Sequence, residues 1–599
     1  MRMLSRIAKA GLLSACLLLS VTPGFAQDRP REARAARAFN IPVQLSASER
    51  ENYQAIFADL RAQNWAGAAG RLDAMRPGPL HDLARALLYT MPGSPRVEQR
   101  PLGELLERAP DLPQAADLAR LASLRGSVAI PELPEPHRLA DPAGQPRRQR
   151  PRAIRGDAVA DALEPLIQPL LVDDQPFEAE TLFNSRRGEL SDEARTAFAQ
   201  RIAWVYFLNN RDADARRIAE IGRNGVTEWA VQSEWVAGLA AWRMGDCRAA
   251  ADHFATVASR AGDQEMTAAG HFWAARADTA CRRPERVQAR LQAAARSSET
   301  FYGLLAQSAL GIRQRPAPLD PLSADEWRQL SDRPNVRAIV ALAEIGEAGI
   351  AGDLIRHQAR IGQPRDHEPL IHLAARLNLT GAQMWLAHNG PRGHRTDTHD
   401  RYPSPSWRPS RGWRVDQALV FAHALQESGF RPDAISGAGA RGLMQVRPGT
   451  AGDMARARGE TVSAAQLNVP SVNIEYGQSY LEYLRDQPNT GGLLPRVIAA
   501  YNAGPAPLAE WNMRFDQSDP LLFIESIPYW ETRGYVPIVL RNYWIYEEEA
   551  GADSPSRRAL VAGLWPRFPG LPGPSAVRIR PNRTQTAMNR SDDDSEGTR

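Results

Sequence analysis

Cysteine is scarce in this 599-residue chain, which contains three. Cys16 lies near the N-terminus, so only Cys247 and Cys281 remain in the body of the chain. They occupy similar places in successive helical repeats, and either form one disulfide in an oxidising compartment or remain two buried thiols. No metal-ligand spacing accompanies them, so the sequence predicts neither a metal site nor a cofactor.

Long apolar runs are also rare. Beyond the N-terminus no stretch approaches the ~20 apolar residues that span a bilayer, so no transmembrane segment is expected. The one apolar run, residues 12–21, follows basic residues and precedes small ones, which predicts a secretory signal peptide over residues 1–26. An alternative is a lipoprotein signal over residues 13–16 that would leave the chain acylated at Cys16. Either reading predicts export to the periplasm.

Charge of either sign is not in large excess. The formal net charge is +4, the pI is near 9.0, and 24% of residues are charged against 43% hydrophobic. This describes a globular protein with a mildly basic balance. Such a balance suits an acidic polymer, but it does not choose between cell-wall glycan, nucleic acid and an anionic membrane.

Strand patterns are almost absent, and helical periodicity fills most of the chain. A helical segment is expected over residues 27–126, and an α-superhelix of stacked hairpins over residues 156–395, with turns about every 35 residues. Those turns fall at residues 209–210, 245–246 and 280–281. Residues 565–599 are expected to be a disordered tail.

Between the two helical parts, residues 127–155 are rich in proline and arginine, which excludes a continuous helix or strand. The segment is predicted to be an exposed, solvated basic linker. An alternative is that its arginines contact an anionic wall polymer.

Glu427 lies at the end of a mostly apolar helix that Gly429 and Pro432 stop. A carboxylate there faces the negative end of the helix dipole and a desolvation cost, and both raise its pKa. Such a group can hold a proton near neutral pH. The simpler alternative is a surface glutamate at a helix end.

Three later stretches could bear on chemistry. Residues 436–442 are glycine-rich and run into Gln445, whose amide could donate to and accept from a sugar. The loop fits neither a dinucleotide nor a P-loop fingerprint, because no strand precedes it and no Gly-Lys-Ser/Thr follows. Residues 499–504 end a helix, and residues 527–536 lead into an aromatic one. Taken separately, the last two read as a helix cap and as an ion pair between Glu531 and Arg533.

Together, in this order and spacing, the motifs resemble the catalytic domain of the soluble lytic transglycosylases, lysozyme-like enzymes that cleave bacterial peptidoglycan. The resemblance covers residues 402–551. Its strongest pieces are Glu427-Ser428, Gly442-Leu443-Met444-Gln445, Ala500-Tyr501-Asn502-Ala503-Gly504 and Glu531-Thr532-Arg533. The superhelix and the segment Tyr302-Gly303-Leu304-Leu305-Ala306 resemble the large periplasmic members, in which helical repeats close into a ring. An all-α fold is therefore expected, with an α-superhelix followed by a lysozyme-like, mostly helical catalytic domain.

The resemblance also implies residue roles. Glu427 would be the single catalytic acid and base, and Ser436 would lie near the N-acetyl group of the substrate. Gln445 and Tyr501 would line the groove, and Glu531 would be a buried carboxylate that supports the site. The implied substrate is the peptidoglycan glycan strand, with other cell-wall enzymes as further partners and no nucleic acid.

The implied reaction cleaves the β-1,4 bond between N-acetylmuramic acid and N-acetylglucosamine and leaves a 1,6-anhydromuramoyl end. One departure from the family pattern is Arg447, where many members carry methionine, so no role is transferred to it. One alternative is a hydrolytic lysozyme on the same fold, with Asp433 or Asp453 as a second carboxylate. Another is a superhelical wall scaffold that carries an inactive lysozyme-like module.

Overall fold

The computed structural model describes residues 39–580 apart from residues 128–129, 141–144, 226, 314–320 and 395. The predicted signal peptide and the lipoprotein alternative at Cys16 lie outside the described residues, as does the end of the predicted tail. Within the described ranges the chain is almost entirely helical, and no helix there is long and apolar enough to cross a membrane.

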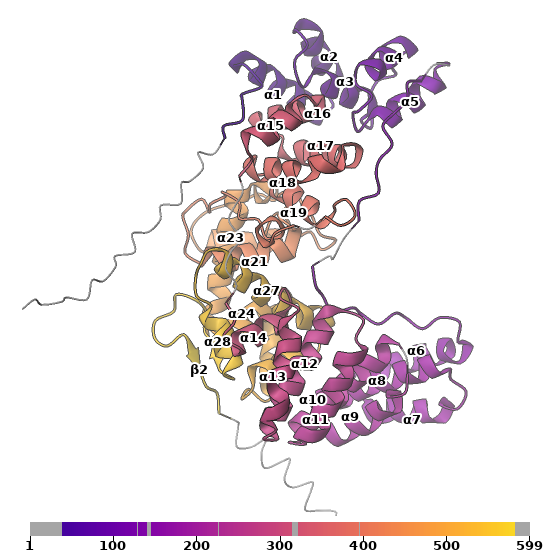
Figure 1. The fold of residues 1–599 in the computed structure, drawn as a ribbon, viewed down its shortest axis with the longest axis vertical. Helices are drawn as coiled ribbons and strands as arrows, with labels where there is room; N and C mark the ends of the chain where they lie inside the picture. Colours follow the sequence, from indigo (N-terminus) through magenta and orange to yellow (C-terminus); the bar gives the residue numbers. More distant parts are fainter. Residues whose placement is uncertain are drawn as a thin grey trace, which may run out of the picture.

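The N-terminal helices share one hydrophobic core with helices that come two hundred residues later in the chain, at the top of Figure 1. Glu344 accepts hydrogen bonds from the backbone N–H groups of Gln44 and Leu45, at 2.7 and 3.2 Å. The helices of this unit are α1 Ala47–Arg61, α2 Trp65–Ala74, α3 His81–Thr90, α4 Gln99–Arg108, α5 Ala115–Leu124, α15 Ala324–Ser331, α16 Pro334–Glu344, α17 Ala348–Ile361, η2 Pro364–Asp366, α18 His367–Arg376 and α19 Thr380–His388.

The second unit is a row of helical hairpins at the bottom of Figure 1. Its helices are α6 Ala158–Val172, α7 Pro176–Arg186, α8 Asp192–Leu208, α9 Asp212–Ala219, η1 Glu220–Gly222, α10 Glu228–Arg243, α11 Cys247–Arg260, α12 Gln264–Ala280, α13 Pro284–Ala295 and α14 Phe301–Ala309. The predicted turns are confirmed. Asn210, Gly245 and Arg282 take positive φ there, at 58°, 79° and 57°.

The residues predicted to form a single domain, 156–395, divide between two hydrophobic cores. The hairpins α6–α14 share their core with the helices that follow residue 400, whereas α15–α19 pack with α1–α5. Apolar periodicity shows which face of a helix is buried but not which helix covers it.

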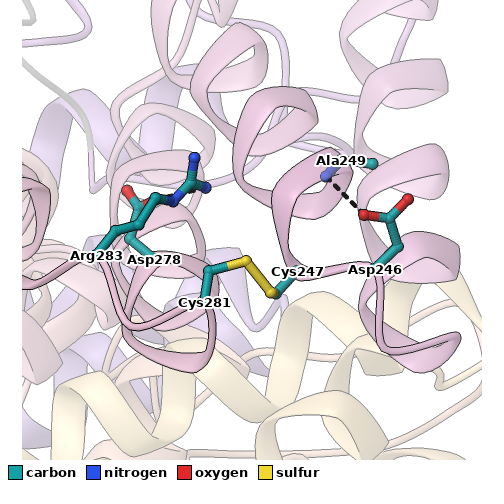
Figure 2. The surroundings of a disulfide bond; sticks show 6 residues. All are labelled: Asp246, Cys247, Ala249, Asp278, Cys281 and Arg283. Carbon is teal, nitrogen blue, oxygen red and sulfur yellow. Dashed lines mark hydrogen bonds and ion pairs between the residues drawn. A yellow bond between two sulfur atoms is a disulfide. The ribbon is translucent and has the colours of Figure 1, made fainter.

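Cys247 and Cys281 form a disulfide, which decides between the two readings that the sequence left open. The bond joins the first residue of α11 to the C-cap of α12 (Figure 2). Beside it the Asp246 side chain accepts from the N–H of Ala249 at 3.0 Å and caps α11. The bridge closes a separation of 34 residues, so it limits the unfolded chain and stabilises this pair of helices.

The C-terminal helices share the core of the hairpins, and Phe301 of α14 stacks on Trp544 with ring centroids 5.2 Å apart. The elements of this part are α20 Thr398–Arg401, α21 Gln417–Ser428, α22 Pro448–Arg456, η3 Ala465–Asn468, α23 Pro470–Arg485, α24 Leu494–Ala503, α25 Pro505–Arg514, α26 Pro520–Glu525, α27 Trp530–Glu549, α28 Pro555–Val561, β1 Trp565–Pro566 and β2 Ala576–Val577.

The expectation of disorder from residue 565 is wrong for residues 565–580. Strand β1 pairs antiparallel with β2, and Trp565 and Phe568 are buried in the core. The Trp565 indole N–H donates to the carbonyl of Gln517 at 2.6 Å. The segment is rich in proline and glycine, but burial of its few aromatic residues is enough to hold it against the core.

The expectation of a solvated linker is wrong for residues 145–152, which we call the strap. Arg148 forms a bidentate pair with Glu525, at 2.6 Å for both contacts, and the Glu525 side chain is 0% exposed. Arg541, also fully buried, donates to the carbonyl of Pro146. A basic run that looks solvated in the sequence is held here because one of its arginines meets a buried carboxylate from α26.

Candidate active site

Helix α21 carries Glu427 in its last turn. The Asp416 side chain caps its start by accepting from the N–H of Ala418 at 2.9 Å. Gly429 ends the helix in the left-handed conformation, with φ 57°, as the sequence predicted. The helix is buried over most of its length, and this holds Glu427 half-buried at its exit.

The Glu427 carboxyl is held in a partly dry environment. The hydroxyl of Tyr535, on α27, donates to Glu427 Oε1 at 2.6 Å. Burial raises the pKa of Glu427 to about 7; the Tyr535 hydrogen bond opposes this rise, and the charge of Glu531 adds to it. The group can therefore both give and take a proton at neutral pH.

The glycine-rich loop after α21 is fixed to that helix and to α23. The Ser428 hydroxyl donates to the carbonyl of Leu443 at 2.8 Å. The fully buried side chain of Asn473 accepts from the N–H of Met444 and donates to the carbonyl of Arg441, both at 2.8 Å. These bonds satisfy buried backbone groups and set the position of the loop relative to Glu427.

Gly442 is the one position in this loop where the contacts exclude a side chain. Its φ is 72°, and an added Cβ would lie 2.3 Å from Asn473 Nδ2 and 2.3 Å from the carbonyl oxygen of Leu467. No other residue fits there without displacing the loop.

Ser436 and Gln445 lie in the same loop, and their side chains form hydrogen bonds with its backbone. Ser436 Oγ accepts from the N–H of Ala440 at 3.0 Å. The Gln445 amide donates to the carbonyls of Ala434 and Gly442, at 3.1 and 2.9 Å. Both amide hydrogens of Gln445 are therefore engaged within the loop, and its carbonyl oxygen is the part left to meet a ligand.

Tyr501, at the end of α24, joins this loop to α21. Its hydroxyl donates to the carbonyl of Met444 at 2.8 Å, and its ring lies 4.8 Å from the ring of His423. His423 is fully buried one turn before Glu427, and its Nδ1 lies 2.8 Å from the carbonyl of Leu419. Burial lowers the pKa of His423 to about 4, so this ring is neutral beside the carboxyl.

Glu531 is exposed, so the expectation of a buried carboxylate at this position is wrong. It lies in the first turn of α27 and accepts from the Asn502 amide at 3.2 Å, and the Thr532 hydroxyl donates to Asn502 Oδ1 at 2.6 Å. The exposure follows from its place in the first turn of the helix, whose opposite side meets the core. Glu531 nevertheless lies near enough to Glu427 for its charge to raise that pKa.

Arg533 does not pair with Glu531, contrary to the simpler reading of the sequence. Its guanidinium donates to the carbonyl of Ile527 at 3.1 Å and lies 3.9 Å from the centre of the Trp204 ring, on α8. Burial lowers the pKa of Arg533 to about 9. This contact attaches the start of α27 to the hairpins.

A cavity of 540 Å³ is lined by Gln426 and by Tyr535, the residue that hydrogen-bonds to Glu427, whereas Glu427 itself does not line it. The walls of this cavity come from two distant parts of the chain. The catalytic side includes Gln426, Glu531 and Tyr535, and the other side includes Arg147 and Arg150 of the strap. A second cavity of 590 Å³ shares three of its lining residues with the first. The shared residues are Arg150, Trp530 and Arg533.

Three residues that the sequence left open line neither cavity. Asp433 and Arg447 are exposed, and Asp453 forms an exposed pair with Arg456 of its own helix at 3.0 Å. Among the described residues no group of three or more histidine, cysteine or acidic side chains is placed to hold a metal ion.

The sequence of α21 and of the glycine-rich loop has a counterpart among known families. Residues 407–523 match the family model described as the transglycosylase SLT domain. The match holds Glu427, the glycine-rich loop and Tyr501 of the predicted site, while Tyr535 and Glu531 lie just after it.

Several known proteins are similar to this chain over stretches longer than residues 407–523. The soluble lytic murein transglycosylase of Salmonella typhimurium is 40% identical over 160 residues, which is 25% of this chain and 24% of that protein. The Escherichia coli K12 protein of the same name is 39% identical over 164 residues, 27% of this chain and 24% of that protein. A putative soluble lytic murein transglycosylase of Haemophilus influenzae is 35% identical over 269 residues, 43% of each chain. The chain thus spans about a quarter of the length of the first two relatives.

Two solved structures resemble the whole architecture. The lytic transglycosylase Slt of Pseudomonas aeruginosa, an inactive mutant, has a TM-score of 0.53 at 22% identity, over 84% of this chain and 81% of that one. The 70 kDa soluble lytic transglycosylase of Escherichia coli has a TM-score of 0.51 at 18% identity, over 88% of this chain and all of that one. The likeness confirms the predicted fold class, an all-α superhelix followed by a lysozyme-like SLT domain.

Sequence reasoning missed several residues around the SLT site. Tyr535 had a usable signal, because it follows Glu531 by four residues on one helix and so lies on the same face. Asn473 and His423 gave none, since a lone polar residue in an apolar helix does not reveal its partner. The strap arginines gave a misleading signal, because the segment that contains them has the composition of a linker.

Proposed function

We propose that the protein is a lytic transglycosylase, a carbon–oxygen lyase that cleaves the β-1,4 bond between N-acetylmuramic acid and N-acetylglucosamine in peptidoglycan. The observation that carries this is the Glu427 carboxyl, which lies within the residues that match the SLT family model and whose pKa burial raises to about 7. It accepts a hydrogen bond from Tyr535, and Tyr535 lines a cavity. The related proteins named as murein transglycosylases support the same reaction.

Glu427 acts twice in this proposal. As an acid it gives its proton to the glycosidic oxygen, and the bond from that oxygen to the anomeric carbon of the muramoyl residue breaks. As a base it then takes the proton of the muramoyl six-position hydroxyl, whose oxygen attacks the same carbon. The product is a 1,6-anhydro end, and no water is consumed. A pKa near neutrality serves both steps.

The remaining site residues bind substrate in this proposal. Ser436 and the free amide oxygen of Gln445 face the sugar from the glycine-rich loop, and Tyr501 holds that loop against α21. Glu531 lines the cavity at the entrance to the groove. The Tyr535 hydroxyl keeps the Glu427 carboxyl in one orientation during both proton transfers.

The products distinguish this reaction from hydrolysis. We expect digestion of purified sacculi to release muropeptides with 1,6-anhydromuramoyl ends, because Asp433 is exposed and Asp453 is paired with Arg456 of its own helix, so neither is held as a second carboxylate to position a water molecule. Mass spectrometry separates the two reactions by the mass of one water per cleaved bond. Reducing ends as the main product would overturn the proposal and favour a lysozyme.

The pH dependence of cleavage should report the pKa of Glu427. The protonated carboxyl starts the reaction, so the rate should fall as pH rises through about 7. Glu531→Gln removes a neighbouring negative charge. This lowers the pKa of Glu427, so the rate should fall at lower pH than in the parent. Tyr535→Phe removes a hydrogen bond to the charged form of Glu427. This raises the pKa of Glu427, so the rate should fall at higher pH than in the parent.

Initial rates measured across a pH series would check both directions. Asp453→Asn is the matched control, because this carboxylate is exposed and paired with Arg456, and its profile should follow the parent. If the rate falls at the same pH in the parent, in Glu531→Gln and in Tyr535→Phe, a group other than Glu427 controls the rate.

We also propose that the protein works in the periplasm, on peptidoglycan glycan strands and alongside other cell-wall enzymes. The disulfide between Cys247 and Cys281 supports an oxidising compartment. The substrate named for the related proteins supports the same location. The signal over residues 1–26 stays a prediction.

A further inference from the structure

The strap is held rigidly in place at the edge of the SLT site. Besides the Arg148–Glu525 pair, the N–H of Gln149 donates to Asp263 Oδ2 at 3.1 Å, and the Trp229 indole N–H donates to the carbonyl of Arg152 at 2.9 Å. The Arg148 guanidinium also lies 5.2 Å from the centre of the Trp235 ring. These contacts fix the backbone on both sides of Arg147 and Arg150.

The side chains of Arg147 and Arg150 are exposed and line the same cavity as Tyr535, whose hydroxyl donates to Glu427. Neither forms an ion pair or a hydrogen bond with a residue of the described ranges. Arg150 also lines the second cavity. Two cations on an anchored backbone therefore face a common space without a counter-charge.

The other charged residues of this cavity do not neutralise them. Arg148 is already paired with Glu525, and Glu265 is a buried carboxylate paired with Arg541 at 3.3 Å. Arg533 is buried over the Trp204 ring. Glu531 is the one exposed carboxylate among the lining residues, and it accepts from Asn502. The cavity keeps an excess of exposed positive charge on its strap side.

We propose that Arg147 and Arg150 bind a carboxylate of the peptide stem that branches from each muramic acid. This rests on the proposed function, since it places a muramoyl residue beside Glu427. The stem leaves the sugar whose glycosidic bond is cleaved, so it enters the space next to the carboxyl. Guanidinium groups suit this ligand because they form paired, charge-assisted hydrogen bonds with carboxylates. The strap thereby selects strands that carry acidic stems.

The test measures binding, so that it does not depend on turnover. Three proteins would carry Glu427→Gln to prevent cleavage: one otherwise unchanged, one with Arg147→Gln and Arg150→Gln, and one with Arg152→Gln. Arg152 is an exposed strap arginine that lines neither cavity and serves as the matched control. Each would be titrated by calorimetry with a glycan oligomer that carries its stems, with its stem-free counterpart, and with one whose stem carboxylates are amidated.

We expect the double variant to bind the stem-bearing oligomer about tenfold more weakly, as loss of a charge-assisted contact predicts. Its binding of the stem-free and amidated oligomers should match the unchanged protein, and Arg152→Gln should match it throughout. The difference should shrink at high salt.

Three results would overturn the inference: no loss in the double variant, an equal loss with Arg152→Gln, or a loss on the stem-free oligomer as large as on the stem-bearing one. The last would assign the arginines to the lactyl carboxylate that stem removal exposes. Product analysis of the parent enzyme decides the proposed function separately, so a failure of one is not a failure of the other.

Discussion

Replacing Glu427 with glutamine should lower the rate of peptidoglycan cleavage by about 10²–10⁴-fold, the range that a positioned general acid contributes. Glutamine has nearly the same shape and can still accept the Tyr535 hydrogen bond through its amide oxygen. It cannot give a proton to the glycosidic oxygen or take one from the six-position hydroxyl. Turnover of purified sacculi, followed by release of soluble muropeptides, would measure the loss.

The same variant also separates an enzyme from a scaffold. Its thermal midpoint and its sedimentation with insoluble sacculi should match the parent, because the fold and the groove are unchanged. Gln426→Glu/Glu427→Gln provides a matched control: it returns a carboxyl one residue away, on a different face of α21, and should not restore cleavage. If Glu427→Gln cleared sacculi as fast as the parent, Glu427 would not be the acid, and another group would have to be sought.

The second large effect concerns the buried pair that holds the strap. Arg148→Leu should lower the free energy of unfolding by about 3–5 kcal/mol, because it leaves the charge of Glu525 buried without a cation. The Glu525 side chain is 0% exposed, and its remaining contact is the Tyr302 hydroxyl, which donates to Oε1 at 2.5 Å. Urea unfolding followed by tryptophan fluorescence would measure the change, since Trp235 lies against this pair.

Arg148→Leu/Glu525→Leu should recover most of that stability, because no buried charge is left unpaired. Arg152→Leu is the matched control on the strap and should unfold like the parent. If Arg148→Leu does not accumulate as folded protein, the rate of trypsin cleavage within residues 147–152 of the milder Arg148→Lys gives the same information, and it should rise. Unchanged stability in Arg148→Leu would mean that Glu525 finds another partner and that the strap is held by its other contacts.

Much of the site was readable from the sequence because its signals are local. The apolar spacing before Glu427 and the stop at Gly429 predict a carboxyl at the exit of a buried helix, and the structure has that helix end there. Hairpin turns were equally local, since Asn210 and Gly245 are residue types that accept positive φ. Motif order also indicated the transglycosylase SLT family, whose model matches residues 407–523.

The sequence could not determine what depends on a distant partner. Whether Glu531 is buried depended on how α27 is rotated against the core, and the prediction from resemblance was wrong. The partition of the repeat helices between two cores depended on which faces meet, and periodicity carries no such information. A composition typical of a linker concealed the strap, because the buried Glu525 that holds Arg148 lies 377 residues further along the chain.

By itself, then, the sequence determined the all-α class, the helical hairpins, the position of Glu427 at a helix exit and the order of the motifs around it, because helix spacing, caps and turns are decided within a few residues. The tertiary structure alone decided the Tyr535 contact, the near-neutral pKa that burial gives Glu427, and the meeting of Arg147 and Arg150 with Tyr535 around one cavity. Desolvation and ion pairing depend on everything that surrounds a group in space, and in this protein those surroundings come from segments hundreds of residues apart.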